Sequence, residues 1–210
     1  MKGLIKKDLL VVRSNAKILF IVLVALSLLA IKDNSSDILV IMPIFSIMMF
    51  VSTFSYDEFN KFNTYVSTLP NGRKEAVKAK YISTFIVILF LLVISFLLAL
   101  GVSYSNKSLD MSNIISTLVG SVFACVVVVS LLYPLMYKYG AMNGRLIIFG
   151  LVIGMSMIGS VLSRMISFDK IINYFDSLGN LFFVITIIIT LLIIIISYFI
   201  SVKIYKNKEF

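Results

Sequence analysis

The side chains that could do chemistry are concentrated in one polar stretch of an otherwise apolar chain. Residues 56–81, YDEFNKFNTYVSTLPNGRKEAVKAKY, begin with the acids Asp57 and Glu58 and go on to five cations. The chain has no histidine and a single cysteine, so it lacks the ligand sets of metal-dependent intramembrane proteases and of ordinary metal sites. The segment NGRKEA has one glycine and no preceding strand, which excludes a phosphate-binding loop. The sequence therefore predicts no catalytic residue, no bound cofactor or metal, and no ATP hydrolysis by the chain itself.

Long apolar runs flank this stretch and must position it. Hydrophobic residues make up 60% of the 210 residues and the mean hydropathy is +1.06, values typical of an integral membrane protein. Each helical crossing needs about 20 apolar residues. The runs predict an all-α membrane fold in one domain, 1–210, with six transmembrane helices over 18–35, 38–56, 81–104, 114–137, 146–163 and 180–202. Every acid falls at the edge of a predicted span or in a loop, which excludes proton- or sodium-coupled transport by intramembrane carboxylates.

Lysine and arginine are distributed unequally between the predicted loops. With a cytoplasmic N-terminus, only four of the 19 cations lie outside: Lys32, Lys107, Arg164 and Lys170. This positive-inside bias predicts that both termini and the 57–80 loop are cytoplasmic. The net charge of +9 then reflects topology and affinity for anionic lipid, with no reason to invoke nucleic acid. A cleaved signal peptide is the rival interpretation of the first 31 residues, but LLAIKDNSS lacks a small-x-small cleavage site, so we expect retention.

The first 17 residues predict an amphipathic helix. An apolar stripe and a basic stripe lie side by side at helical spacing: Ile5, Leu9, Val12 and Ala16 beside Lys2, Lys6, Arg13 and Lys17. We expect this elbow helix to lie along the cytoplasmic face with its apolar side in the acyl boundary. The alternative is a basic anchor that only fixes orientation.

The polar stretch has its own helix signals. Pro70, Asn71 and Glu75 predict a helix that starts near residue 71 and runs into the third span. Apolar side chains are interleaved with the charges, which favours a contact surface for a partner: Phe59, Phe62, Leu69 and Val77. The alternative is a solvated loop whose cations only set topology.

The fifth predicted span carries small residues at four-residue spacing. Gly150 and Gly154 form one such pair, and Ser156 and Ser160 another, which predicts close helix packing. The contact could lie within the subunit or between two subunits. After this span, residues 164–179 predict an amphipathic segment at the outer face.

Three stretches resemble a known family. FSYDEFNKFNTYVSTLPNGRKEAVKAKY is similar to the first cytoplasmic loop of ABC-2 type transporter permeases, in a small six-span group with the pattern YDE...LP-x-x-R-x-x-x-V-x-x-K-Y. LIKKDLLVVR resembles the elbow helix of that group, and YPLMYKYGAMNGRLI its second cytoplasmic loop. GAMNGR has fewer cations than that second loop usually has, so whether it also docks stays open.

The resemblance implies a permease subunit of an ATP-binding cassette exporter in the bacterial cytoplasmic membrane. Separate ATPase subunits would bind ATP and Mg, and a second permease subunit would complete a homo- or heterodimer among the membrane lipids. The group includes the membrane subunits of the phenol-soluble modulin exporter, so the expected solute is amphipathic or hydrophobic: a peptide such as a phenol-soluble modulin or an antimicrobial peptide. The alternative is a non-transporting membrane immunity or sensor subunit.

The resemblance also implies two sets of contact residues. The 57–80 loop would be the coupling segment, with ATPase-contacting positions at Tyr56, Asp57, Glu58, Leu69, Pro70, Arg73, Val77, Lys80 and Tyr81. Spans one and five would line the permease dimer, with interface positions at Gly150, Gly154, Ser156, Gly159 and Ser160.

Overall fold

The computed structural model describes residues 1–32, 42–105, 111–165 and 180–208. These form helices α1 (Lys2–Ser14), α2 (Ala16–Lys32), α3 (Met42–Phe59), α4 (Phe62–Thr68), α5 (Gly72–Ser105), α6 (Met111–Met165) and α8 (Asn180–Lys206). The expected all-α fold is confirmed over the described part of the chain. The predicted outer segment 164–179 falls outside it beyond residue 165.

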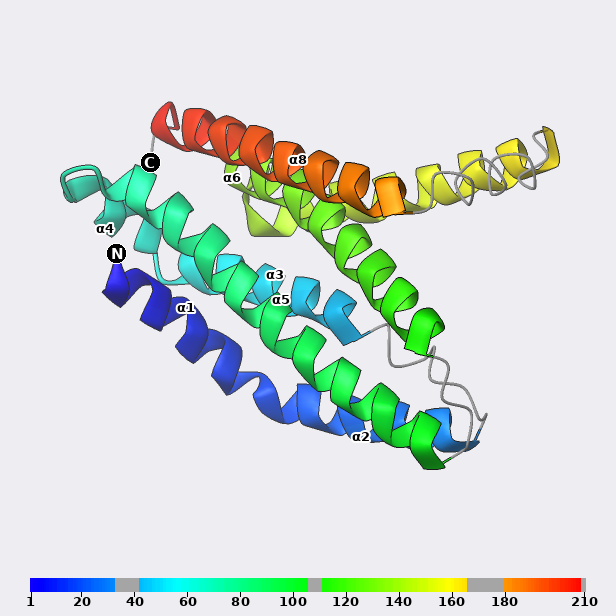
Figure 1. The fold of residues 1–210 in the computed structure, drawn as a ribbon. Coiled ribbons are helices and arrows are strands. Elements are labelled where there is room, and N and C mark those ends of the chain that lie inside the picture. The colour runs from blue at the N-terminus through cyan, green and yellow to red at the C-terminus, as the bar shows by residue number, and fades with distance from the viewer. Residues whose placement is uncertain (33–41, 106–110, 166–179, 209–210) are drawn as a thin grey trace.

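The long helices lie side by side, and both ends of the chain meet at one end of the bundle (Figure 1). The N-terminus, the C-terminal end of α8 and the short helix α4 all lie there, and we call this the loop end. Helices α1 and α2 follow each other along one side of α5, while α6 and α8 pack together on the other side. The shared position of the two ends agrees with an even number of crossings, but the side of the membrane that they face remains a prediction.

Three of the described helices are long and apolar enough to cross a membrane. They cover Gly72–Tyr104, Ile114–Gly144 and Val184–Lys206, and a shorter apolar stretch, Phe20–Leu29, lies in α2. Helix α5 has 34 residues and is about 51 Å long at 1.5 Å per residue, so it extends past a hydrocarbon layer of about 30 Å. All six predicted spans are helical where they are described, yet the count of six crossings stays a prediction.

Helix α6 contains a break that turns one helix into two. Gly140 has φ 85° and ψ 171°, which no helical residue adopts. The first half of α6 runs toward the loop end and the second half runs back (Figure 1). Pro134 is also inside α6, but the non-helical backbone is at Gly140. The predicted separation between spans 114–137 and 146–163 therefore corresponds to this break.

The amino-terminal helix α1 forms as predicted, and part of its apolar stripe packs against protein. Leu9 and Val12 pack against the main core cluster, and Asp8 beside them is buried. Helix α1 contacts both α3 and α5. Leu9 and Val12 are thus partly covered by protein, and the expectation that the stripe lies in the acyl boundary stays a prediction.

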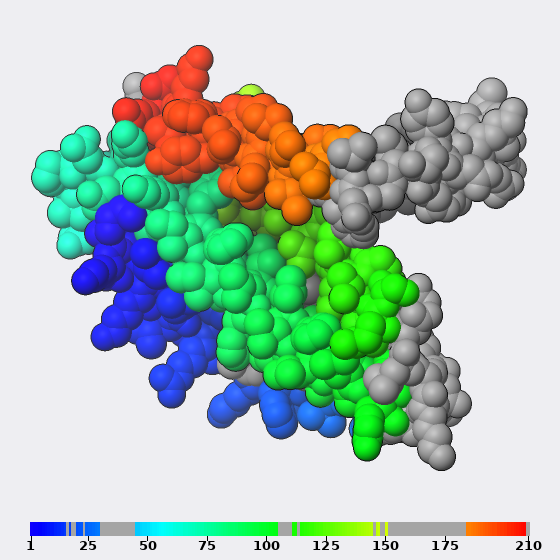
Figure 2. Space-filling view, in the orientation of Figure 1, coloured from blue at the N-terminus to red at the C-terminus, as the bar shows by residue number. Residues whose placement is uncertain are grey.

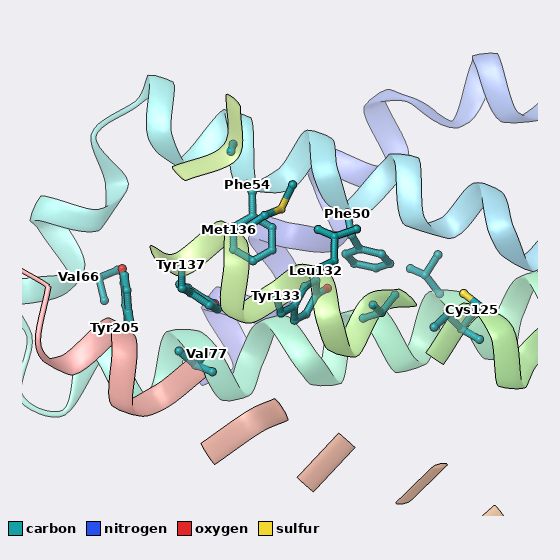
Figure 3. Packing of buried hydrophobic residues seen from close by; sticks show 14 of the residues in the cluster. Phe50, Phe54, Val66, Val77, Cys125, Leu132, Tyr133, Met136, Tyr137 and Tyr205 are labelled. Atoms are coloured by element: carbon teal, nitrogen blue, oxygen red, sulfur yellow. The ribbon is translucent and has the colours of Figure 1, made fainter. Parts of the chain in front are cut away.

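The core is richest in aromatic side chains near the loop end (Figure 3). Phe54 of α3 meets Tyr133 and Tyr137 of α6 edge-on, with ring centroids 5.1 Å apart in each pair. The centroid of Tyr137 lies 4.9 Å from that of Tyr205 of α8. Such edge-on pairs stabilise packing beyond the burial of area alone. Helices α3, α6 and α8 are therefore packed firmly together directly beneath the polar segment.

Candidate functional site

A tight turn connects α4 to α5 inside the polar stretch. Leu69 is extended with ψ 140°, as a residue before proline usually is, and Pro70 follows. Asn71 has φ 56°, and the amide of Gly72 donates to the carbonyl of Leu69 at 3.0 Å. Proline second and a positive φ third are the features of a type II turn. Helix α5 then starts at Gly72, which confirms the predicted helix running into the third span.

Gly72 is required at this turn by close approach. A Cβ atom at this position would lie 2.2 Å from the carbonyl oxygen of Val66 and 2.9 Å from the Cβ of Leu69. The last turn of α4 thus packs directly against the backbone that opens α5. The two helices form one compact unit, and we call residues 57–80 the coupling segment.

Four charged side chains meet where α1, α3 and α5 converge. Asp57 is ion-paired with both Lys7 and Lys80. Asp8 Oδ1 lies 3.2 Å from Lys7 Nζ and 3.3 Å from Lys80 Nζ. The second oxygen of Asp8 accepts a hydrogen bond from Ser83 Oγ at 3.4 Å. We call these four charged residues the charge cluster.

The charge cluster is balanced and largely withdrawn from solvent. The side chains of Asp8 and Lys80 are 3% and 4% exposed, that of Asp57 13%, and that of Lys7 29%. Two carboxylates face two ammonium groups, so every buried charge has an opposite neighbour, as burial requires. Lys7 Nζ also lies 3.7 Å from the centroid of the Phe62 ring, a cation–π contact with α4. The cluster therefore ties the amino-terminal helix to both ends of the coupling segment.

Glu58, the neighbour of Asp57, is directed at a different element. Its Oε2 accepts a hydrogen bond of 2.8 Å from the amide of Ala141, immediately after the break in α6. The end of α3 thus contacts the start of the second half of α6.

A cavity of about 480 Å³ opens among these groups. Its lining includes the whole charge cluster, together with Glu58, Lys61, Tyr137, Gly140, Ala141, Tyr205 and Lys208. The lining is drawn from α1, α3, α4, α5, α6 and the end of α8, so the cavity lies where these six elements meet.

The end of α8 is attached to the coupling segment by polar contacts. Arg73 donates to the carbonyl of Lys206 at 2.7 Å, and Tyr205 donates to the side-chain oxygen of Asn63 at 2.8 Å. Lys208 Nζ donates to the carbonyl of Tyr137 at 2.9 Å, which adds α6 to the same assembly.

Tyr81 links the start of α5 to α8 within the helix bundle. Its hydroxyl is 2.6 Å from Ser197 Oγ and 3.0 Å from Ser201 Oγ of α8. Ser197 in turn donates to the carbonyl of Ser130 in α6 at 2.6 Å. Hydroxyl contacts of this kind hold membrane helices together. Tyr81 therefore joins α5 to α8, and through Ser197 to α6.

The positions expected to contact an ATPase divide into an outer and an inner group. Tyr56, Leu69 and Pro70 are exposed, and Arg73 is partly exposed. Four others face this same chain: Asp57 and Lys80 in the charge cluster, Val77 in the core and Tyr81 at α8. Glu58 is exposed, although its carboxylate accepts the hydrogen bond from Ala141. For Val77 and Lys80 the physical reason is that α5 begins nine residues before the predicted span, so one face of its first turns packs inward.

Two exposed aromatic side chains add to the outer group. Phe59 is 88% exposed and Tyr65 of α4 is 59% exposed. Figure 2 shows the α4 region, in teal, at the left edge of the molecule. We call Phe59, Tyr65, Leu69 and Pro70, together with the adjacent Tyr56, the outer face of the coupling segment. Aromatic side chains on such a surface are typical of protein contacts.

Sequence reasoning missed Lys7 and Asp8. The available signal was that Asp8 is the only acid among the first 32 residues, on a helix otherwise charged with cations. Glu58 was singled out, but the structure directs it to α6 because the break at Gly140 exposes an amide at that point.

The predicted dimer positions lie in the second half of α6. Gly150 is exposed, and no described atom lies within 4 Å of a Cβ placed there. The side chains of Ser156 and Ser160, and the surroundings of Gly154 and Gly159, lie outside the description. Neither a contact within the subunit nor one between subunits is tested at these positions.

The chain was compared with protein families, curated proteins and solved structures. A family model described as "ABC-2 family transporter protein" matches residues 3–206. Neither a curated protein nor a solved structure matches the chain significantly. The family match runs from α1 to the end of α8 and so includes the charge cluster and the coupling segment. The chain therefore belongs to the ABC-2 transporter family, whose members are membrane components of ABC transporters.

Proposed function

We propose that the protein is the permease subunit of an ATP-binding cassette exporter in the bacterial cytoplasmic membrane. ATPase subunits would bind ATP and Mg, and the outer face of the coupling segment would dock on them. The observation that carries the proposal is the two-sided construction of this segment. Phe59 and Tyr65 point away from the protein, while Asp57 and Lys80 tie its inner side to α1, α3 and α5.

This construction suits the transfer of motion. A force applied to α4 reaches α5 through the turn at Gly72, because the backbone of Gly72 packs directly against the last turn of α4. It reaches α1 through the charge cluster and α8 through Arg73. Closely packed elements with discrete contacts switch between arrangements as units. Closure of the ATPase pair would therefore tilt several membrane helices together.

The proposed solute is an amphipathic peptide. Among the described residues, the buried polar side chains away from the loop end are all serine or threonine, for example Ser95, Ser121 and Ser130. An amphipath can slide along such apolar and hydroxyl surfaces without meeting a buried charge. A hydrophobic lipid would suit the same surface, so the substrate test includes both.

The proposed assembly contains two permease subunits joined through Gly150, Gly154, Ser156, Gly159 and Ser160. Small residues at this spacing let two helix backbones approach closely. The exposure of Gly150 leaves this position open to a second copy. With Cys125 replaced by alanine, cysteine at 150 should give an oxidation-dependent crosslinked dimer, and cysteine at Val24 of α2 tests whether the first span contributes. A monomer under oxidising conditions at both positions would contradict this interface.

ATP-dependent transport into inverted membrane vesicles tests the proposed function. Vesicles that contain the chain and its ATPase should accumulate a labelled amphipathic peptide when ATP is added. Replacing Tyr65 by alanine should abolish uptake, while the matched change at Tyr104, which is 77% exposed at the opposite end of α5, should leave it unchanged. Uptake of a labelled lipid without uptake of the peptide would show that the solute is a lipid.

Co-purification separates this proposal from a non-transporting immunity or sensor subunit. A permease should bring down an ATPase from detergent-solubilised membranes, because the sequence predicts that ATP is hydrolysed by a separate subunit. A passive membrane subunit would be recovered without one, and that result would contradict the proposed function.

A further inference from the structure

The break in α6 creates a helix N-terminus inside the protein. At Gly140 the backbone leaves helical geometry, and a new helix starts with Ala141. The first amides of any helix have no acceptor within the helix and carry a partial positive charge. These amides need an acceptor from elsewhere, and a carboxylate is the most favourable one.

Glu58 provides this acceptor from the end of α3. Its Oε2 lies 2.8 Å from the amide nitrogen of Ala141. A Cβ placed on Gly140 would be 2.8 Å from Oε1 of the same carboxylate. Both oxygens therefore lie against the break, at a position where any side chain on residue 140 would push them out. Glycine at position 140 therefore permits the hydrogen bond between Glu58 and Ala141 in two ways. It adopts the positive φ of the break, and it has no side chain to displace the carboxylate.

The two adjacent acids hold two different parts of the molecule. Asp57 is fixed in the charge cluster with α1 and α5, and Glu58 is bonded to the second half of α6. The turn between α3 and α4 follows directly, with Lys61 in a left-handed conformation at φ 50°. Any rotation of the end of α3 must move the Glu58 carboxylate relative to Ala141 or carry helix 141–165 with it.

We propose that Glu58 is the positioning residue through which movement of the coupling segment reaches helix 141–165. This inference rests on the proposed function for the source of the movement. The contact itself is a property of the isolated subunit. The chemistry is a charge-assisted hydrogen bond between a carboxylate and a helix N-terminus, which is stronger than a neutral hydrogen bond and depends on the negative charge.

A distance measurement on the subunit alone tests the contact. Spin labels are placed on cysteines at Phe59 and Met142, which are 88% and 77% exposed, in a Cys125→Ala background in lipid nanodiscs. With Glu58 present, the label distances should form one narrow peak. Glu58→Ala should lose this peak, and Glu58→Gln, which keeps an oxygen acceptor but no charge, should fall between. The control is Glu75→Ala. Glu75 is an acid of the same segment, but it pairs with the amino terminus and not with α6.

Two results of the distance measurement would overturn the proposal. An unchanged peak in Glu58→Ala would overturn it, as would equal broadening in Glu75→Ala. If Glu58→Ala does not accumulate in membranes, Glu58→Gln decides the question, because an unchanged peak in that variant would show that the negative charge is not needed.

A second measurement links the contact to transport. In vesicles with the ATPase, Glu58→Gln should still bind the ATPase, because the residues of the outer face are unchanged and the Glu58 carboxylate is engaged at Ala141. Export should fall about tenfold, within the usual range of coupling between sites. Normal export would contradict the role of Glu58. Failure of the unmodified chain to bind any ATPase would instead contradict the proposed function, and the distance measurement would still stand.

Discussion

At the scale of single residues, the charge cluster determines how the amino-terminal helix is held. Lys80 stands between Asp8 and Asp57, and all three are largely buried. Removing one member of a buried ion pair is costly because its partner is left uncompensated, whereas removing both can be nearly neutral. The effect of a substitution therefore depends on the charge balance that remains.

We expect Lys80→Met to reduce the free energy of unfolding by about 3–5 kcal/mol, because two carboxylates would then share Lys7 alone. The double variant Asp8→Asn, Lys80→Met leaves the balanced pair of Lys7 and Asp57 and should be clearly less destabilised. A denaturant titration in detergent can follow unfolding through the reaction of a thiol dye with Cys125, the only cysteine, which is buried. A double variant as unstable as the sum of both single variants would contradict the cluster.

The close approach at Gly72 gives a second residue-scale prediction. Gly72→Ala would place a methyl group 2.2 Å from the carbonyl oxygen of Val66. Because the fold must shift to accept it, we expect a loss of more than about 1 kcal/mol. Gly101→Ala in the same helix is the matched control, since no described atom lies within 4 Å of its Cβ. The same thiol-dye titration compares them, and equal stabilities would show that the turn is not tightly packed.

At the scale of elements, the apolar runs were enough to predict where helices lie. The start of α5 near residue 71 followed from Pro70, Asn71 and Glu75, which are local signals. The pairing of Asp8 with Lys80 could not be predicted, because the two residues are 72 positions apart and nothing local relates them. The role of Glu58 was hidden for the same reason, since it depends on backbone geometry at Gly140.

Two neighbouring leucines of α1, Leu9 and Leu10, can test which side of this helix packs against the protein. Leu9 packs against the core cluster, whereas Leu10 is 52% exposed. We expect Leu9→Ala to cost about 1–2 kcal/mol, less than a fully buried leucine because Leu9 is only partly buried. Leu10→Ala should change stability little. A larger loss for Leu10 would mean that α1 lies with its other side against the protein, as a lipid-facing elbow would require.

At the scale of the whole molecule, the topology follows from the unequal distribution of cations and remains to be measured. Cysteines replacing Lys74, at the start of α5, and Met111, at the start of α6, lie at opposite ends of the bundle. In intact cells, a membrane-impermeant maleimide should label residue 111 and not residue 74. Labelling of residue 74 alone would reverse the orientation and place the coupling segment out of reach of ATP.

The central claim is that the outer face of the coupling segment docks on an ATPase subunit. The most direct test is site-specific photocrosslinking in native membranes, with a photoreactive phenylalanine at Tyr65 and, as the control, at Tyr104. We expect the residue at position 65 to form a covalent adduct with an ABC ATPase, and the residue at position 104 to form none. Adduct formation at neither position, with the chain correctly inserted, would contradict this account.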